Sequence, residues 1–350
     1  MTKFIHTADL HIGKSRTLPD YLERQELMLD GIYKVAGDRD IKLVLMAGDI
    51  FESKNIRWEE QQLFMEKLFE YDAKGFTTVV CNGNHDELAT GVSHMWLPAM
   101  IQKAGGLNNT YVIDGESQRV SLDDLEIAVI PVVNNNMTTS ELEAEVTRLW
   151  ESDIDAKGQM IEYDKPFVVM LHATISGANT DIGYNISGGP RIPDLHFVDY
   201  WAVGDIHRSQ EIGHNAWYSG SPIQHDFGDA QPKGVLVVEA EKDGNPSTEL
   251  VELEGIKPLV TITELPEEWP TDCYIRYLGP LESLMELPEN VIKTEGVAPE
   301  AEDDESEEGP VQMEFTDSLT EGLPDFLHTK GVPAELQEEG VRWVQEKYVK

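Results

Sequence analysis

Basic residues are scarce in this chain. Its 350 residues include 27 Lys and Arg against 65 Asp and Glu, which gives a formal net charge of −38. Protein contacts to phosphate depend on Lys and Arg, so the composition argues against a broad basic surface that would hold nucleic acid. It argues equally against binding to an anionic membrane.

Cysteine and long apolar runs are also nearly absent. The two cysteines, Cys81 and Cys273, cannot form a disulfide framework, and a reducing cytoplasm is the simplest setting. No run approaches the ~18 apolar residues of a membrane helix. Residues 2–8 predict a strand rather than a signal peptide. Hydrophobic residues still make up 40% of the chain, enough for a core in one large domain and a small one.

Short apolar runs alternate with amphipathic stretches along the first 250 residues. The runs predict strands at 3–8, 43–47, 77–81, 126–132, 167–171 and 201–203, and the stretches predict helices at 19–35, 58–73 and 140–150. This alternation predicts an α/β layered fold with buried sheet strands.

The last 100 residues differ in character. Short strands are predicted at 260–264 and 273–277. An acidic run with 7 acids in nine residues (EAEDDESEE, 300–308) predicts a solvated, self-repelling linker. Two short helices are predicted beyond it, at 316–328 and 334–348. Their apolar residues cannot be buried by so short a tail alone, so we expect the tail to dock on the body of the chain or on a partner.

Polar clusters follow five of the predicted strands. They are Asp9-Leu10-His11, Gly48-Asp49, Gly83-Asn84-His85-Asp86-Glu87, His172, and Gly204-Asp205-Ile206-His207. Binding sites of open α/β sheets form beyond the carboxyl ends of the strands, so we expect the five clusters to converge.

The side chains of these clusters share one chemistry. Imidazole, carboxylate and amide oxygens are ligands of Mn²⁺, Fe²⁺, Zn²⁺ or Mg²⁺. Alternation along an extended segment predicts that Asp9 and His11 point to the same side. Asp49 can bridge two cations, as in two-metal sites that act on phosphate esters. His85 need not be a ligand and can serve as a general acid.

Each cluster alone has an ordinary interpretation. An Asp-x-His is usually a surface turn, Gly-Asp after a strand is usually a turn or a helix cap, and a single buried His is usually hydrogen-bonded. The joint occurrence at matched strand ends favours a metal site. His225 and His214 are expected to be structural or on the surface, and Lys14 is a candidate for a local phosphate contact.

These motifs resemble the calcineurin-like metallophosphoesterases. Within that superfamily they resemble the double-strand-break-repair nucleases, bacterial SbcD and its phage, archaeal and eukaryotic counterparts. The resemblance rests on HTADLHIGK at 6–14, AGDIFES at 47–53, YSGSPIQHDFGD at 218–229 and KGVLVVE at 233–239. It covers about residues 1–245 and fades in the last 100 residues.

The resemblance implies a four-layer α/β/β/α sandwich with a small α+β capping domain and a C-terminal helical tail. It divides the chain into a nuclease domain (1–250), a capping domain (251–295), an acidic linker (296–310) and a helical partner-binding segment (311–350). It implies two divalent metal ions, typically Mn²⁺, with Mg²⁺ as the alternative. One metal would be held by Asp9, His11, Asp49 and His207, the other by Asp49, Asn84, His172 and Asp205. His85 would be the catalytic histidine that does not bind metal.

The fifth cluster departs from the family pattern. The family usually has Gly-His-x-His there, whereas this chain has Gly-Asp-Ile-His, so Asp205 stands where a ligating His is expected. A carboxylate is a harder donor and should favour Mn²⁺ or Mg²⁺ over softer metals. The alternative is that Asp205 caps a turn and water completes the site.

The function that the resemblance implies is a metal-dependent DNA nuclease acting in recombination, repair or replication. It implies a homodimer in the cytoplasm. It also implies an ABC-type coiled-coil ATPase partner of the SbcC kind, bound by the tail. Two alternatives stay open: a phosphodiesterase or phosphatase for small molecules or phosphoproteins, and a non-catalytic scaffold for an ATPase. The first leaves the apolar tail unexplained, and all the proposed ligands can bind metal, which disfavours the second.

Overall fold

The computed structural model describes residues 1–88, 93–132, 137–152, 164–279 and 287–294. The chain divides into two compact units, Met1–Ala298 and Pro299–Lys350, and all described residues belong to the first. The predicted tail helices and the whole predicted acidic linker (296–310) lie outside the described residues. Among the residues described, no helix is long and apolar enough to cross a membrane.

The first sheet has six strands in the order β12-β11-β1-β2-β3-β4. Its strands are β1 (Thr2–Thr7), β2 (Leu43–Ala47), β3 (Thr77–Cys81), β4 (Thr110–Ile113), β11 (Val235–Ala240) and β12 (Ser247–Val251). Strands β1 to β4 are parallel, while β11 and β12 extend the sheet in antiparallel pairs. Strand β2 is buried along its whole length, as expected for a strand covered on both faces.

The second sheet also has six strands, in the order β5-β6-β7-β8-β10-β9. Its strands are β5 (Gln118–Ser121), β6 (Glu126–Val132), β7 (Phe167–His172), β8 (Tyr200–Gly204), β9 (Gln210–Gly213) and β10 (Ala216–Tyr218). The inner strands β6, β7, β8 and β10 run parallel, and the two edge strands are antiparallel to their neighbours.

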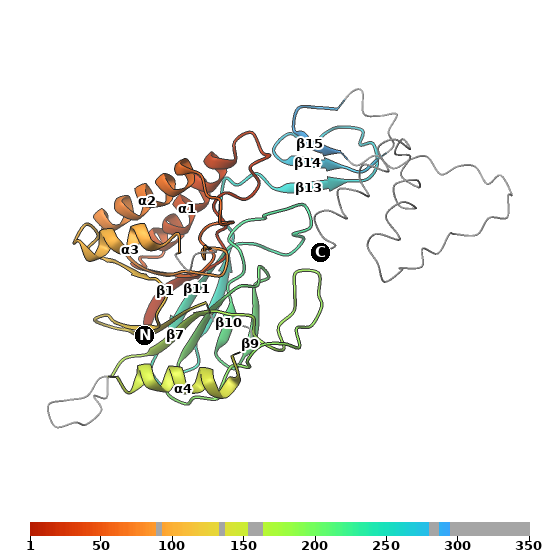
Figure 1. Cartoon of the computed structure of the whole chain (residues 1–350). Coiled ribbons are helices and arrows are strands. Elements are labelled where there is room, and N and C mark those ends of the chain that lie inside the picture. The colour runs from red at the N-terminus through yellow and green to blue at the C-terminus, as the bar shows by residue number, and fades with distance from the viewer. Residues whose placement is uncertain (89–92, 133–136, 153–163, 280–286, 295–350) are drawn as a thin grey trace, which may run out of the picture. The chain divides into compact units, whose positions relative to one another are not determined.

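Helices cover the outer face of each sheet, which gives four layers (Figure 1). Helices α1 (Tyr21–Asp38), α2 (Trp58–Ala73) and α3 (Trp96–Lys103) pack on the first sheet, and α4 (Thr139–Trp150) packs on the second. Between the sheets lies an apolar layer that includes Phe4, Leu45, Met170 and Tyr200. The α/β/β/α prediction for this part of the chain is confirmed.

A third, separate sheet of three parallel strands follows the second. It consists of β13 (Leu259–Ile262), β14 (Tyr274–Tyr277) and β15 (Val291–Thr294). A small apolar cluster joins Leu259 and Tyr274 to Leu18, and the Tyr274 hydroxyl donates to the Asp20 carboxylate. These strands fall in the range expected for a capping domain, whose boundaries stay a prediction.

The predicted strands at 43–47, 77–81 and 126–132 and the helix at 58–73 match β2, β3, β6 and α2 residue for residue. Helix α4 starts with a capping box, in which Thr138 and Glu141 satisfy each other's backbone N–H groups. The elements not predicted individually are short ones, namely α3 and the strands β4, β5, β9, β10, β12 and β15. A strand predicted at 234–241 corresponds to β11.

Candidate metal centre

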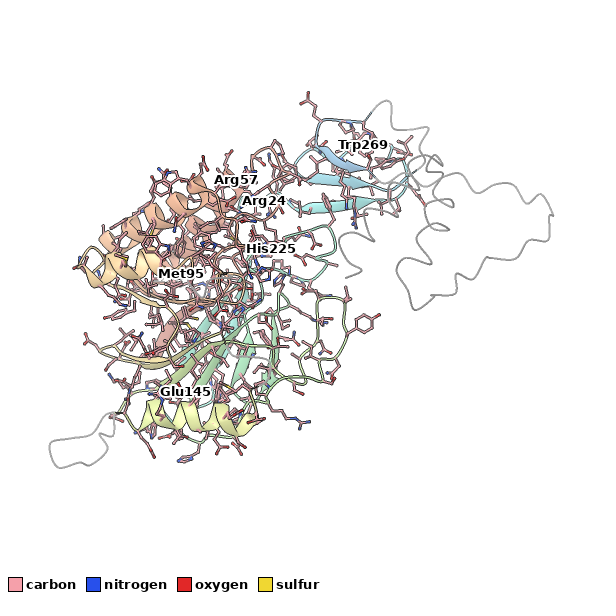
Figure 2. All side chains as sticks on the ribbon, in the orientation of Figure 1. Arg24, Arg57, Met95, Glu145, His225 and Trp269 are labelled. Atoms are coloured by element: carbon pink, nitrogen blue, oxygen red, sulfur yellow. The ribbon has the colours of Figure 1, made fainter. Side chains whose placement is uncertain are left out.

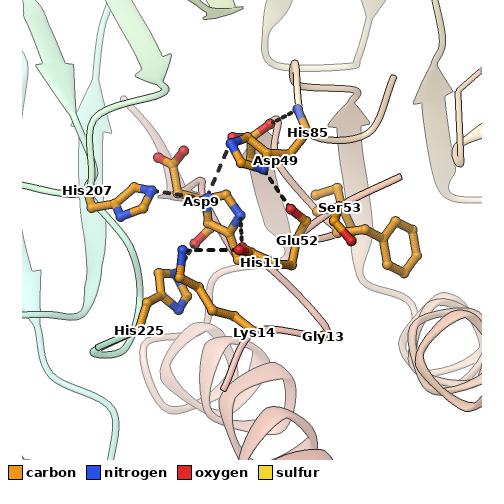
Figure 3. A network of polar contacts seen from close by, with 12 residues as sticks. Asp9, His11, Gly13, Lys14, Asp49, Glu52, Ser53, His85, His207 and His225 are labelled. Atoms are coloured by element: carbon orange, nitrogen blue, oxygen red, sulfur yellow. Dashed lines mark hydrogen bonds and ion pairs between the residues drawn. The ribbon is translucent and has the colours of Figure 1, made fainter. Parts of the chain in front are cut away.

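The residues of the five polar clusters lie at the carboxyl ends of parallel strands from both sheets. Asp9 and His11 follow β1, Asp49 follows β2, Asn84 and His85 follow β3, His172 ends β7, and Asp205 and His207 follow β8. The three strands β1 to β3 belong to the first sheet and β7 and β8 to the second. The clusters converge because the two packed sheets bring these ends together. Figure 3 labels Asp9, His11, Asp49, His85 and His207, which come from four of the five clusters.

One group of donors surrounds His11. Its Nε2 lies 3.0 Å from Nε2 of His207 and 3.6 Å from Oδ2 of Asp49. A carboxylate oxygen of Asp9 and ring nitrogens of His11 and His207 all lie within 4.8 Å of one another. These four residues are the set that the resemblance implies for the first metal.

A second group surrounds the ring of His172. Its Nε2 lies 2.9 Å from Oδ1 of Asn84, 3.4 Å from Oδ1 of Asp49 and 3.8 Å from Oδ1 of Asp205. Its Nδ1 lies 2.8 Å from the carbonyl oxygen of Ala47. That carbonyl can only accept, so Nδ1 carries the proton and donates to it. These four residues are the set implied for the second metal, and Asp49 lies between the two groups.

The backbone conformation of these segments differs from the sequence-based expectation. Strand β1 ends at Thr7, and Asp9 and His11 have positive φ values of 54° and 45°. Asp49 and Asp205 also have positive φ, 50° and 109°. The predicted alternation along an extended segment is therefore wrong. The side chains converge because the chain turns sharply after each strand, through conformations that non-glycine residues rarely adopt and that cluster at functional sites.

Two glycines make room for this convergence. Gly48 has φ +88°, and a Cβ atom there would lie 2.4 Å from Nδ1 of His172. A Cβ atom at Gly83 would lie 2.1 Å from Oδ1 of Asp49. The glycines of the Gly-Asp and Gly-Asn pairs therefore allow the backbone of one strand end to touch the proposed ligands of another.

Asp86 holds two of the strand-end loops together. Its fully buried carboxylate accepts hydrogen bonds from the backbone N–H groups of Ile50, Phe51 and Gly83, at 3.1, 2.8 and 2.7 Å. Burial, together with the nearby Asp49, raises the pKa of this carboxyl to about 7. Asp86 thus fixes the loop that carries Asp49 against the loop that carries Asn84 and His85.

Glu52 is a site residue that the sequence reasoning missed. Its Oε2 lies 2.9 Å from Nδ1 of His11, and its Oε1 lies 3.3 Å from Nζ of Lys14. Its carbonyl oxygen lies 2.6 Å from Nδ1 of His85. The signal available in the sequence was its position, three residues after Asp49 on the same strand-end loop.

Asp205 lies inside the site. The Thr174 hydroxyl donates to its Oδ2 at 2.5 Å, and its other carboxylate oxygen faces His172. Its backbone N–H lies 3.1 Å from Oδ1 of Asp9. One oxygen of the carboxylate is therefore fixed and the other points into the group around His172.

His225 has a structural role, as expected, and it performs that role inside the site (Figures 2 and 3). Its Nε2 donates to the carbonyl oxygen of Asp9 at 2.7 Å, and its ring centroid lies 5.0 Å from that of His11. It supports the loop that carries Asp9. His214 instead lines a separate cavity of about 900 Å³ beside β9.

The ionisable groups of the site affect one another strongly. Burial raises the pKa of the Asp9 carboxyl well above its usual value, and the neighbouring Asp49 and Asp205 raise it further. Burial also acts to raise the pKa of the Asp49 carboxyl. Attraction to His172 outweighs burial there, so the pKa of Asp49 is lowered. Burial lowers the pKa of His207 to about 3 and that of His11 below its usual value. The two imidazoles are neutral, so each offers a lone pair.

This donor set fits divalent cations. Carboxylate, imidazole and amide oxygens suit Mn²⁺, Mg²⁺ and Zn²⁺. A cation among Asp9, Asp49 and Asp205 would also offset the repulsion that raises the pKa of Asp9.

The comparison with known protein families agrees with this fold. The sequence profile described as calcineurin-like phosphoesterase matches residues 2–209. The chain belongs to the calcineurin-like phosphoesterase family.

Individual relatives are more distant. The chain is similar to the SbcD component of the SbcCD nuclease of Bacillus subtilis, with 26% identity over 294 residues that cover 74% of this chain and 71% of the relative. It is also similar to the "DNA double-strand break repair protein Mre11" of Methanopyrus kandleri, with 23% identity covering 76% of this chain and 60% of the relative. A solved structure, TT1561 of Thermus thermophilus, aligns with a TM-score of 0.41 and 13% identity, covering 69% of this chain and 99% of that one.

Proposed function

We propose that this chain is a metal-dependent DNA nuclease of the SbcD type. The observation that carries the proposal is the convergence of seven donor side chains from five strand ends on one site, with His85 beside it. The two relatives, one named as a nuclease subunit and the other as a DNA double-strand break repair protein, support DNA as the substrate rather than a small phosphodiester.

Two divalent cations would be bound by the two donor groups. Asp9, His11, Asp49 and His207 would hold one, and Asp49, Asn84, His172 and Asp205 the other. Mn²⁺ is the proposed metal, with Mg²⁺ as the alternative, because four of the seven donors are oxygen ligands and Asp205 adds one where the family has nitrogen. Such a metal pair polarises a phosphodiester and supplies the water nucleophile.

His85 would be the general acid. Its backbone N–H donates to Oδ1 of Asp49 at 2.9 Å, and its Nδ1–H donates to the carbonyl oxygen of Glu52. The second bond keeps one proton on Nδ1 and leaves Nε2 as the atom that would take up a second proton from water and deliver it to the leaving oxygen. The ring centroid lies 4.8 Å from that of His11, so this nitrogen belongs to the same site.

We further propose that the chain works as a homodimer with an ABC-type coiled-coil ATPase of the SbcC kind, in the cytoplasm. Segment 311–350 would bind the ATPase, because its apolar residues need a surface to cover them. A chain with a net charge of −38 attracts duplex DNA only weakly, so the ATPase would supply most of the contacts to it.

Activity measurements on the purified chain test the proposal. We expect Mn²⁺-dependent cleavage of linear DNA, stimulated by the ATPase, at a specificity constant far above that for a chromogenic phosphodiester. Turnover of the chromogenic ester without DNA cleavage would favour a small-molecule phosphodiesterase. A protein that takes up no metal after Mn²⁺ reconstitution would favour a non-catalytic scaffold.

A further inference from the structure

The connection between β7 and β8 includes a tight hairpin next to the metal centre, residues 176–190. Gly177 donates to the carbonyl oxygen of Ile186 and Ile186 to that of Ala178, both at 2.8 Å. Nearer the tip, Thr180 donates to the carbonyl oxygen of Tyr184 at 2.8 Å. Ala178 is fully buried and Ile186 packs beside it in the core under α4. The hairpin is therefore a defined element with its base anchored in the protein.

The hairpin is hydrogen-bonded to β9 and approaches the site at one further residue. Asn179 N–H donates to the side chain of Gln210 at 2.8 Å, and the Gln210 amide donates back to Asn179 at 2.7 Å. At the tip, Oδ2 of Asp181 lies 3.9 Å from Nδ1 of His207, a proposed metal ligand. The tip thus stands beside the place where a phosphodiester would be held.

Two large apolar side chains project from this tip into solvent. Ile182 is 75% exposed and Tyr184 is 71% exposed, and they flank Gly183 at the turn. They follow Asp181 by one and three residues along the chain, and Asp181 is the residue that approaches His207. A rigid turn that holds an aromatic and an aliphatic side chain in water is a pre-organised contact surface.

We propose that Ile182 and Tyr184 pack against unpaired nucleobases next to the scissile phosphate, so that the site prefers single-stranded or frayed DNA. This inference rests on the proposed nuclease function. Stacking of bases on aromatic side chains is the common, sequence-tolerant way in which proteins hold single strands. A base pair in a duplex keeps its faces covered by its neighbours, so the hairpin gains this contact only where bases are unpaired.

The chemistry of the hairpin favours bases over phosphates. Segment 176–190 contains no Lys or Arg, and its one charged residue is Asp181. A tip of this composition offers no cation to the DNA backbone, and its large exposed side chains are apolar and aromatic. In a chain this acidic, contact with the bases compensates for the weak electrostatic attraction of the strand.

Binding to two oligonucleotides tests the inference. One is a fluorescein-labelled single strand with normal bases, and the other has the same backbone with abasic units throughout. Fluorescence anisotropy is measured with Mn²⁺ on the full chain in the His85→Ala background. We expect the normal strand to bind about tenfold more tightly than the abasic one. Tyr184→Ala and Ile182→Ala should each remove most of this preference without changing affinity for the abasic strand.

Matched variants define the outcome. Tyr184→Phe keeps the ring and should keep the preference, and Leu265→Ala, which removes a 58% exposed side chain elsewhere, should change nothing. If each Ala variant binds each of the two strands as tightly as the parent does, the role proposed for the hairpin is overturned. The proposed nuclease function is not affected by that outcome. If the Ala variants sediment differently from the parent but keep its preference for the normal strand, the tip contacts a second copy of the chain and not DNA. A parent protein that binds neither strand and cleaves no DNA would contradict the proposed function itself.

Discussion

Oε2 of Glu52 lies 2.9 Å from Nδ1 of His11, on the side of the imidazole opposite the nitrogen that faces His207 and Asp49. A carboxylate in this position fixes which nitrogen carries the proton and makes the other a better donor. The carbonyl of the same residue accepts from His85. Glu52 therefore orients both a proposed ligand and the proposed general acid.

Replacing Glu52 with Gln should weaken Mn²⁺ binding about 10- to 100-fold, the usual effect of losing such a carboxylate. The amide cannot stabilise the His11 ring electrostatically, although its size is the same. Calorimetric titration with Mn²⁺ measures the change. Glu59→Gln, an exposed carboxylate on α2, is the matched control and should bind as the parent does. Unchanged affinity in Glu52→Gln would remove this residue from the metal centre.

Replacing His85 with Ala should lower the rate of DNA cleavage about 10²- to 10⁴-fold, the range for loss of one general acid. Mn²⁺ binding should persist, because His85 is not a proposed ligand. The variant should hydrolyse a p-nitrophenyl phosphodiester at a rate much closer to that of the parent, because this leaving group departs without a proton. Normal DNA turnover by the variant, or equal losses on both substrates, would speak against a general acid at this position.

Replacing Asp205 with His should shift metal preference from Mn²⁺ towards Zn²⁺, because imidazole is a softer donor than carboxylate. The measurement is the ratio of the two metals retained after equilibration with both. Asp226→His places the same substitution at an exposed position. If the ratio moves equally in both variants, Asp205 does not bind the metal.

His6 should make stability depend on pH. It is fully buried, its Nδ1 lies 2.9 Å from the Tyr200 hydroxyl, and burial lowers its pKa to about 3. The unfolded chain binds this proton below about pH 6.5, so stability falls as pH drops from there towards 3. At pH 5 the loss should be about 2 kcal/mol.

Replacing His6 with Gln should remove this part of the pH dependence. Gln stays neutral and can keep a hydrogen bond to Tyr200. Urea unfolding with EDTA present, at pH 7 and pH 5, compares the two proteins while metal is excluded from both. Parallel pH dependence in the parent and the variant would mean that His6 gains its proton in the folded state as well.

Removing residues 311–350 should abolish co-purification with an SbcC-type ATPase and leave hydrolysis of single-stranded DNA intact. The segment carries the apolar residues that need a covering surface, and the proposed ligands and His85 all precede residue 208. Mixing tagged ATPase with full-length and shortened chains measures the difference. If the tagged ATPase retains as much of the shortened chain as of the full-length chain, the ATPase binds a part of the protein outside residues 311–350.

The positions of the proposed ligands could be predicted because each follows a strongly apolar strand. Strand-end clusters such as Asp9-Leu10-His11 need only the order of the elements and the rule that parallel strands end at one edge. The local backbone could not be predicted in this way. The positive φ values of Asp9 and His11 depend on contacts with the loop after β2, where Asp9 N–H donates to the Gly48 carbonyl and His11 N–H to that of Asp49.

The roles of Glu52 and His225 depend on the fold and not on local pattern. His225 meets Asp9 across 216 positions of sequence, and Glu52 acts through both its side chain and its carbonyl. The short edge strands β5, β9 and β12 were missed for a related reason. Apart from Val120, their residues are exposed or half-buried. These strands gain their conformation from the neighbouring strand, so their residues carry little apolar pattern.

The contact between His11 and His207 spans 196 positions. A nascent chain therefore carries the first of the proposed ligands long before it contains the last, so the complete set needs synthesis past residue 207. Contacts of such sequence separation form late and slow the folding of a chain. The complete set of proposed ligands therefore exists only once both sheets have packed against each other, so a partly synthesised chain lacks the full site.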